Sequence, residues 1–364
     1  MSLSDEVKAA RTEIVADGYE MSIGEVMNLY RDKELFITPE FQRLFRWDVS
    51  RKTKFIESLL LGIPIPPIFV FQRDDGVWEL VDGLQRLSTI FEFTGILKNE
   101  DGDIQTLSTL EGTRYLPSLT GTRWESDDDE KSLPGHLQIE IKRARLRVEI
   151  LKKESDPAAK FELFQRLNTG GAGLSEQEVR NCVAVMLNQK LFQWLKEKSA
   201  NADFRATVDQ TGTARDKQAE VELVLRFLAF RNVPYMPGLD VHEYLDGALM
   251  KIATDADFDL AKEAIEFNRT FALINRALGD SAFKRWNGNE FSGKFLMSVF
   301  EVVATGVAAN IERIESLEDP NAYIRQRCID LWGDAVFQKN SGAGVRGTTR
   351  LTNLLPMAES FFQK

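Results

Sequence analysis

The 364-residue sequence has only two histidines and two cysteines, and each scarcity excludes a class of chemistry. His136 and His242 are far apart, so a histidine-rich zinc site or a nuclease built on several histidines lacks its parts. Cys182 and Cys328 cannot form a disulfide framework or a metal-binding Cys-x-x-Cys pair, and their apolar helical surroundings predict burial. Each lone histidine is expected to be structural. Any hydrolysis must therefore use carboxylates, amides and arginines.

Long hydrophobic runs and an excess of positive charge are also missing. No apolar run approaches the roughly 20 residues of a membrane helix, and the N-terminus lacks the basic and apolar segments of a signal peptide. We therefore expect a cytoplasmic protein without membrane association. The 46 basic and 56 acidic residues give a net charge of −10. That balance excludes a globally basic nucleic-acid-binding surface but permits a local basic face.

The hydrophobic pattern divides the chain into a mixed first half and a helical second half. In the first half we expect helices over 5–31, 50–62 and 84–97, strands over 68–71, 77–81, 137–141 and 146–150, and loops over 98–135. Further helices are expected over 156–168, 175–187, 189–199, 217–231, 240–252, 256–279, 289–306 and 319–338, with a flexible loop at 341–349 before a short terminal helix. We therefore predict an α+β domain, residues 1–185, followed by an all-α helical domain, residues 186–364.

Local signals place several boundaries. Ser22 with Glu25, and Ser175 with Glu178, have the spacing of a capping box, in which two side chains satisfy free backbone N–H groups at a helix start. Residues 73–76, Arg-Asp-Asp-Gly, have the composition of a hairpin turn between two strands.

The most basic stretch of the chain lies between Lys142 and Lys153 and holds six lysines and arginines. It could follow a nucleic-acid backbone. Because the charges alternate with apolar residues, we favour a solvated edge strand protected by its charged side chains.

The strongest local signal is Asp82-Gly83-Leu84-Gln85-Arg86, at a predicted junction of strand and helix. A helix N-terminus offers free N–H groups, a glycine allows close approach of a ligand, and an arginine adds a permanent cation. The segment therefore outlines a phosphate site, in which Asp82 could hold Mg²⁺ and Gln85 could orient a water molecule. An equally weighted alternative is that Asp82 caps the helix and Arg86 forms a salt bridge.

Two further segments could contribute. Gln42, Arg43 and Arg46 lie among aromatic residues, where a guanidinium can stack on a ring and bind a phosphate in a bidentate manner. By itself this segment is better explained as an aromatic core with solvent-facing arginines. Asn168-Thr169-Gly170 ends a predicted helix and could touch a nucleotide, although glycine-rich helix C-caps are the more common explanation.

Four separated motifs together resemble one known family. They are PEFQRLFRW at 39–47, FIESLLLGIPIPP at 55–67, VDGLQRLST at 81–89, and LNTGG at 167–171 followed by Leu174-Ser175. In this order and spacing they resemble the N-terminal domain of GmrSD-type restriction enzymes, domain of unknown function 262, over about residues 20–185. The family signature is Asp-Gly-Gln-Gln-Arg, whereas this chain has Leu84 at the middle position and so lacks one amide.

The resemblance implies a ParB/sulfiredoxin-like fold that binds a nucleotide at the turn from strand to helix. It also implies Mg²⁺-dependent hydrolysis of a nucleoside triphosphate within a DNA-restriction or phage-defence system. Arg86 and Arg43 would then neutralise phosphates, Asp82 would hold the metal, Gln85 would position water, and Asn168 would complete the pocket. The remaining expected nucleotide contacts are Gln42, Arg46, Gly83, Thr169 and Gly170.

Two other functions stay open from the sequence. The chain could be a non-catalytic DNA-binding adaptor that recruits a nuclease, or a ParB-like domain that nicks DNA itself. Many relatives carry a His-Asn-His nuclease domain, which two separate histidines cannot supply. DNA, a partner nuclease subunit and a second copy of the chain therefore join the nucleotide as candidate partners.

Overall fold

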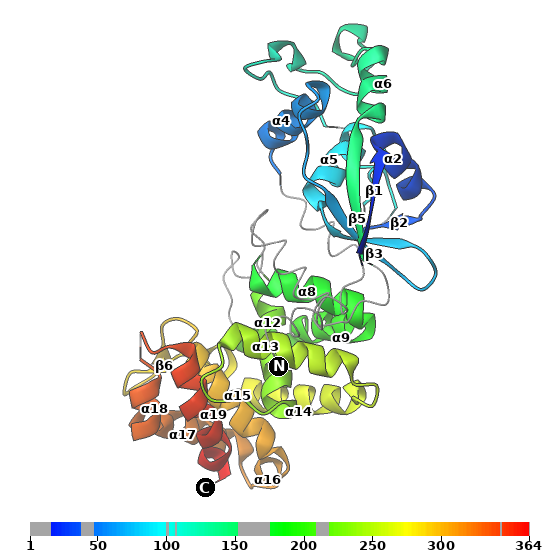
Figure 1. Ribbon diagram of the computed structural model, residues 1–364. Helices are drawn as coiled ribbons and strands as arrows, with labels where there is room; N and C mark the ends of the chain where they lie inside the picture. Colours follow the sequence, from blue (N-terminus) through cyan, green and yellow to red (C-terminus); the bar gives the residue numbers. More distant parts are fainter. Residues whose placement is uncertain are drawn as a thin grey trace. The chain divides into compact units, whose positions relative to one another are not determined.

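The computed structural model describes residues 16–37, 47–99, 102–105, 108–151, 175–208, 218–342 and 344–363. The chain forms two compact units, Met1–Gly173 (unit 1) and Leu174–Lys364 (unit 2), and each is described by itself (Figure 1). The domain limits 1–185 and 186–364 remain a prediction. None of the described helices is long and apolar enough to cross a membrane.

Unit 1 is a small mixed sheet with helices packed around it. Its strands are β1 (Ala16–Ser22), β2 (Leu35–Phe36), β3 (Ile68–Gln72), β4 (Trp78–Asp82) and β5 (Arg145–Leu151). Its helices are α2 (Ile23–Arg31), α4 (Val49–Leu60), α5 (Leu84–Phe93) and α6 (Gly135–Arg143), with two short 3₁₀ turns at Pro117–Leu119 and Asp129–Lys131. The α+β class predicted for this part of the chain is confirmed.

The sheet has the strand order β1-β5-β3-β4-β2. The pairs β1–β5 and β3–β4 are antiparallel, and the pairs β5–β3 and β4–β2 are parallel. The predicted hairpin between β3 and β4 is confirmed, because the Arg73 N–H donates to the Val77 carbonyl at 2.9 Å. Strands β3 and β4 both contribute buried residues to the core, including Ile68 and Val70 of β3 and Leu80 of β4.

Two predictions of secondary structure in unit 1 were wrong. Residues 16–22 form β1 and not part of the first of the helices expected over 5–31, because they pair with β5 over seven residues. The predicted start of the second of these helices is confirmed, since Ser22 caps α2 by accepting from the Glu25 N–H at 3.1 Å. Residues 137–141 belong to helix α6 and not to a strand. Apolar and polar residues alternate here, which predicted a strand wrongly: Ile141 is buried, whereas Ile139 is exposed. The Gln138 side chain ties this helix to the preceding loop through the Trp124 and Leu133 carbonyls.

The basic stretch is not an edge strand. Strand β5 lies inside the sheet with β1 on one side and β3 on the other, and the edges are β1 and β2. Its alternation instead reflects the two faces of the sheet: Arg145 and Arg147 are exposed, whereas Leu146 and Val148 are buried. Arg147 pairs with Glu149 at 2.5 Å, and this carboxylate raises the pKa of the arginine.

Unit 2 is almost entirely helical. Its longer helices are α8 (Glu176–Leu187), α9 (Gln189–Ser199), α10 (Ala202–Val208), α12 (Ala219–Asn232), α13 (Val241–Thr254), α14 (Leu260–Leu278), α15 (Met297–Ala309), α17 (Pro320–Asp330) and α19 (Gly347–Gln363). Short helices α16 (Ile311–Glu315) and α18 (Ala335–Asn340), two 3₁₀ turns (Gly279–Ser281 and Leu331–Gly333) and the hairpin β6 (Arg285–Trp286) and β7 (Phe291–Ser292) complete it. This hairpin lies where the sequence predicted the start of a helix over 289–306.

The core of unit 2 is rich in phenylalanine. Phe204, Phe227, Phe267 and Phe271 form a cluster with ring centroids 4.5 to 5.4 Å apart. Such pairs add stability beyond the burial of their area. The predicted capping box of Ser175 and Glu178 at the start of α8 is confirmed. So is the burial of both cysteines, and burial raises the pKa of the Cys328 thiol to about 12.

The turn from β4 to α5 needs a glycine at position 83. Gly83 has φ +101°, in the left-handed region that favours glycine. A Cβ atom there would also lie 2.4 Å from the Cγ2 atom of Ile68 on the neighbouring strand. Because Ile68 is buried, it has no room to withdraw. The bare backbone of Gly83 therefore sets the close approach of β3 to the start of α5.

Substitution of Gly83 by alanine should destabilise unit 1 more than the same change at Gly76. Gly76 also has positive φ, +84°, but open space surrounds its Cα atom. We expect a loss in the free energy of unfolding of roughly 2–4 kcal/mol for Gly83→Ala, from strain plus overpacking, and about 1 kcal/mol for Gly76→Ala. Urea unfolding followed by tryptophan fluorescence measures both. Equal losses would show that the contact with Ile68 does not constrain the turn.

Glu79, buried within β4, should make unit 1 less stable as the pH rises. Burial raises the pKa of its carboxyl group above the ordinary 4.5, an effect that Arg73 partly opposes. The folded state therefore favours the protonated form, and the cost of the charge grows as the pH rises from 4.5 through the raised value. Glu79→Gln should protect the β4 amides from hydrogen exchange near neutral pH and lose this advantage below pH 4.5. Exposed Glu34→Gln is the control, and equal protection in both variants would contradict the prediction.

Candidate functional site

The candidate site of unit 1 is the turn at which β4 ends and α5 begins. Asp82 is the last residue of β4, Gly83 is the N-cap position, and Leu84 is the first residue of the helix. Within the part of the chain that the structure describes, no side chain caps the N-terminus of α5. Its first backbone N–H groups, which have no partner within the helix, therefore stand at a turn whose cap residue has no side chain.

Asp82 and Arg86 form an ion pair one helical turn apart. The Nη2 atom of Arg86 lies 2.8 Å from Oδ2 of Asp82, and its Nη1 donates to the Pro66 carbonyl at 3.0 Å. The arginine side chain is 13% exposed and the aspartate side chain 30% exposed. Of the two parts of the structural alternative, the salt bridge is confirmed, and capping by Asp82 is wrong.

This pairing leaves part of each group open to further chemistry. Among the described residues, no group donates to Oδ1 of Asp82, and none accepts from Nε of Arg86. Gly83 also brings its backbone beside the guanidinium, since a Cβ there would lie 3.5 Å from Nη2. The turn therefore presents a guanidinium with a spare donor and a carboxylate with a spare acceptor. Both lie beside a helix start that no described side chain caps.

Gln85 connects the turn to the preceding aromatic motif. Its side chain is buried, and Oε1 accepts from the Trp47 backbone N–H at 3.1 Å. The Trp47 ring packs edge-on against Phe55 of α4, with centroids 5.7 Å apart. The amide oxygen that was expected to orient water thus also holds the chain where it enters α4.

Pro66 belongs to a proline-rich strap, residues 61–67, between α4 and β3. The strap borders a cavity of about 310 Å³, whose lining includes Ile63 and Ile65 of the strap and Arg145 and Arg147 of β5. By accepting from Arg86, the Pro66 carbonyl ties this strap to the α5 turn. The cavity is therefore lined in one part by apolar residues of the strap and in another by the charged residues Arg145, Arg147 and Glu20.

The described residues bring together only part of the predicted site. Asp82, Gly83, Gln85 and Arg86 share the turn. The other predicted contacts lie outside the described residues: Gln42, Arg43, Arg46, Asn168, Thr169 and Gly170. Within the described ranges, no group of three histidine, cysteine, aspartate or glutamate side chains could hold a metal ion.

Sequence reasoning missed three participants at the turn: Ile68, the Pro66 carbonyl and the Trp47 N–H. Each acts through packing or through a backbone group, which carries no residue-type signal. The proline-rich motif at 55–67 marked the strap, and the spacing of four between Asp82 and Arg86 marked the ion pair. What those motifs contact was visible only in the fold.

Comparison with known proteins supports the resemblance that the motifs indicated. No curated protein matches the chain. Residues 23–184 match the family model described as the N-terminal domain of the GmrSD restriction endonuclease. The match contains all four sequence motifs and the whole β4–α5 turn. Residues 23–184 are therefore identified as a segment similar to the N-terminal domain of GmrSD restriction endonucleases.

Proposed function

We propose that unit 1 binds a nucleoside triphosphate at the β4–α5 turn and hydrolyses it with Mg²⁺, as a component of a DNA-restriction or phage-defence system. The match of residues 23–184 to the GmrSD family model supports the biological role. The observation that carries the chemistry is the uncapped start of α5 beside Arg86. The more specific ParB/sulfiredoxin-like fold is part of this proposal.

A phosphate group suits the turn for electrostatic reasons. The start of a helix presents N–H donors and a partial positive charge to an anion. Gly83 lets the phosphate approach the backbone, and Arg86 retains N–H groups beyond those given to Asp82 and Pro66. Because Arg86 is already oriented by two partners, it would neutralise the phosphate without a large loss of side-chain freedom.

Asp82 is the described residue that fits a magnesium ion at this turn. Mg²⁺ binds through one or two carboxylates together with phosphate oxygens and water. Oδ1 of Asp82 accepts from no described residue, whereas Oδ2 accepts from Arg86. The ion would supply charge neutralisation of the bound phosphates, and the nucleotide itself would complete the shell.

Chain connectivity supports a contribution from the aromatic motif. Arg46 precedes Trp47 directly in the sequence, and the Trp47 N–H is held by Gln85 within α5. Arg43 and Arg46 are therefore proposed as further phosphate contacts, and Gln42, Asn168, Thr169 and Gly170 as contacts to the rest of the nucleotide. Leu84, in place of the glutamine of the family signature, is expected to slow hydrolysis more than binding.

A non-catalytic DNA-binding adaptor is the second candidate. Exposed Arg145 and Arg147 beside the strap favour it, because arginines can neutralise backbone phosphates. The pairing of Arg147 with Glu149 and the net charge of −10 weigh against it. DNA nicking by this domain has less support, since the described residues hold no cluster of three metal-binding side chains. We also propose a nuclease subunit and a second copy of this chain as partners.

Two substitutions separate the proposed roles at the turn. Arg86→Lys keeps the charge but cannot contact Asp82, Pro66 and a phosphate together, so triphosphate affinity should fall about tenfold or more. Asp82→Asn keeps an acceptor for Arg86 but removes the carboxylate, so hydrolysis should fall about 100-fold or more while binding without Mg²⁺ persists. Calorimetry with each of the four ribonucleoside triphosphates and a phosphate-release assay measure these effects.

The exposed Arg114→Lys variant, away from the turn, is the matched control and should behave as the wild type. Thermal unfolding of every variant checks that the fold is intact. The proposal fails if the wild type binds none of the four triphosphates, or if both turn variants bind and hydrolyse as the wild type does.

A salt titration distinguishes the adaptor. If the chain binds DNA through several phosphates, its affinity should fall steeply as salt is raised, and Arg145→Ala should reduce the slope. Fluorescence anisotropy with a labelled duplex measures both quantities. Absence of DNA binding at low salt would contradict the adaptor and leave the nucleotide proposal untouched.

A further inference from the structure

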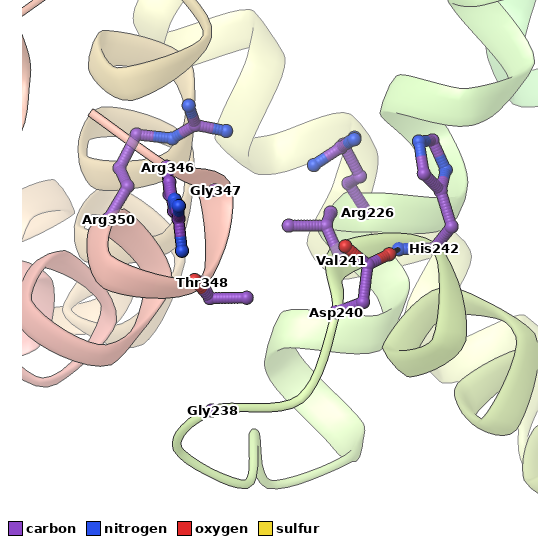
Figure 2. A pocket seen from close by; sticks show the side chains of 9 residues that line it. All are labelled: Arg226, Gly238, Asp240, Val241, His242, Arg346, Gly347, Thr348 and Arg350. Atoms are coloured by element: carbon purple, nitrogen blue, oxygen red, sulfur yellow. Dashed lines mark hydrogen bonds between the residues drawn. The ribbon is translucent and has the colours of Figure 1, made fainter. Parts of the chain in front are cut away.

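Unit 2 contains a cavity of about 620 Å³ between the starts of helices α13 and α19. Its polar lining comes from Arg226, Arg346, Arg350, His242, Thr348 and Asp240. In Figure 2, Arg346 and Arg350 stand on the α19 side, and Arg226 and His242 on the opposite side. Three arginines thus line one space, although unit 2 as a whole has no basic stretch of sequence.

A buried carboxylate holds two of these arginines in place. Glu301 of α15 is 0% exposed and accepts from Arg350 through Nε at 2.6 Å and Nη2 at 3.0 Å, and from Arg226 through Nη1 at 3.4 Å. Arg226 also donates to Glu222 at 2.7 Å. Burial favours protonation of Glu222, but Arg226 and Arg180 outweigh it and lower the pKa of this carboxyl group.

The ion pair with Glu301 leaves Arg350 with hydrogen-bond donors that are not used. Its Nε and Nη2 atoms are bound to Glu301, whereas no described residue accepts from Nη1. An arginine fixed by a buried partner on one edge presents its other edge with little further loss of freedom.

A second buried arginine determines which ring nitrogen of His242 carries the hydrogen. Arg180, fully buried, donates to Asp246 Oδ1 at 2.7 Å and lies 2.9 Å from Nδ1 of His242. Because a guanidinium has only donors, Nδ1 must accept, and the ring hydrogen of the neutral histidine is on Nε2. His242 therefore offers a hydrogen-bond donor at the cavity.

Arg346 is the cavity arginine that is held by no carboxylate among the described residues. This exposed arginine forms no ion pair with any described residue. It directly precedes α19, a helix of 17 residues, and no described residue accepts from the Thr348 or Thr349 backbone N–H. Asp240, the carboxylate in the lining, keeps its charge and is held as the N-cap of α13, where it accepts from the His242 N–H at 2.7 Å. The uncommitted donors of Arg346, the spare edge of Arg350 and the start of α19 together suit an anion.

We propose that this cavity binds the phosphate group of a small phosphate ester of nucleotide size. Arg346, the spare edge of Arg350 and the start of α19 would contact the phosphate, and His242 would donate to a ligand oxygen. A volume of about 620 Å³ exceeds what a lone phosphate fills and lies in the range of small-molecule sites. The residues belong to unit 2, so the proposal does not depend on nucleotide binding at the β4–α5 turn.

Calorimetry on the full chain with adenosine 5′-monophosphate and with inorganic pyrophosphate tests the site. Arg346→Ala should weaken binding of both probes about tenfold or more, and Arg346→Glu should abolish it. Thr348→Val, which removes a hydroxyl group at similar size, should weaken binding several-fold. Adenosine, which has no phosphate, should not bind in the same range.

Two matched variants make the result specific. Arg276→Ala removes an equally exposed arginine of α14 that does not line the cavity, and should leave binding unchanged. In an Arg86→Lys background, which weakens the proposed phosphate site of unit 1, the Arg346-dependent part of the binding should persist. Arg346 has no ion pair among the described residues, so its variants should unfold at the wild-type temperature. The proposal is overturned if neither probe binds the wild type, if adenosine binds equally well, or if Arg86→Lys abolishes binding while Arg346→Ala does not.

Discussion

The candidate site of unit 1 depends on the contact between the bare backbone of Gly83 and the buried side chain of Ile68. That contact sets where α5 starts relative to the sheet, and therefore where the Arg86 side chain lies. From there Arg86 reaches both Asp82 at the end of β4 and Pro66 in the strap. One steric constraint thus positions a cation, a carboxylate and a loop from three parts of the chain.

Features carried by side-chain spacing were visible in the sequence. The four-residue separation of Asp82 and Arg86, the Ser175–Glu178 capping box and the β3–β4 hairpin all follow from local rules. The four motifs likewise indicated the family before the fold was considered.

Features that depend on partners distant in sequence were not visible. Residues 16–22 become a strand only because β5 pairs with them, and 137–141 become helical although their apolar pattern alternates. The basic alternation of β5 could not reveal that the strand has neighbours on both sides. In unit 2, residues of α12, α13 and the start of α19 line the arginine-rich cavity. No single segment of the sequence could therefore predict it.

The family match ends at residue 184, inside α8, whereas the compact unit that contains α8 begins at Leu174. Helix α8 carries Arg180, whose fully buried guanidinium is neutralised by Asp246 and Glu222, far along the chain. A fragment ending at the limit of the match would retain this arginine and lose both carboxylates, leaving a charge and an apolar helix face exposed to water. The family match and the compact unit thus have different limits here, and the last helix of the match has its ion-pair partners in a part of the chain that the match does not cover.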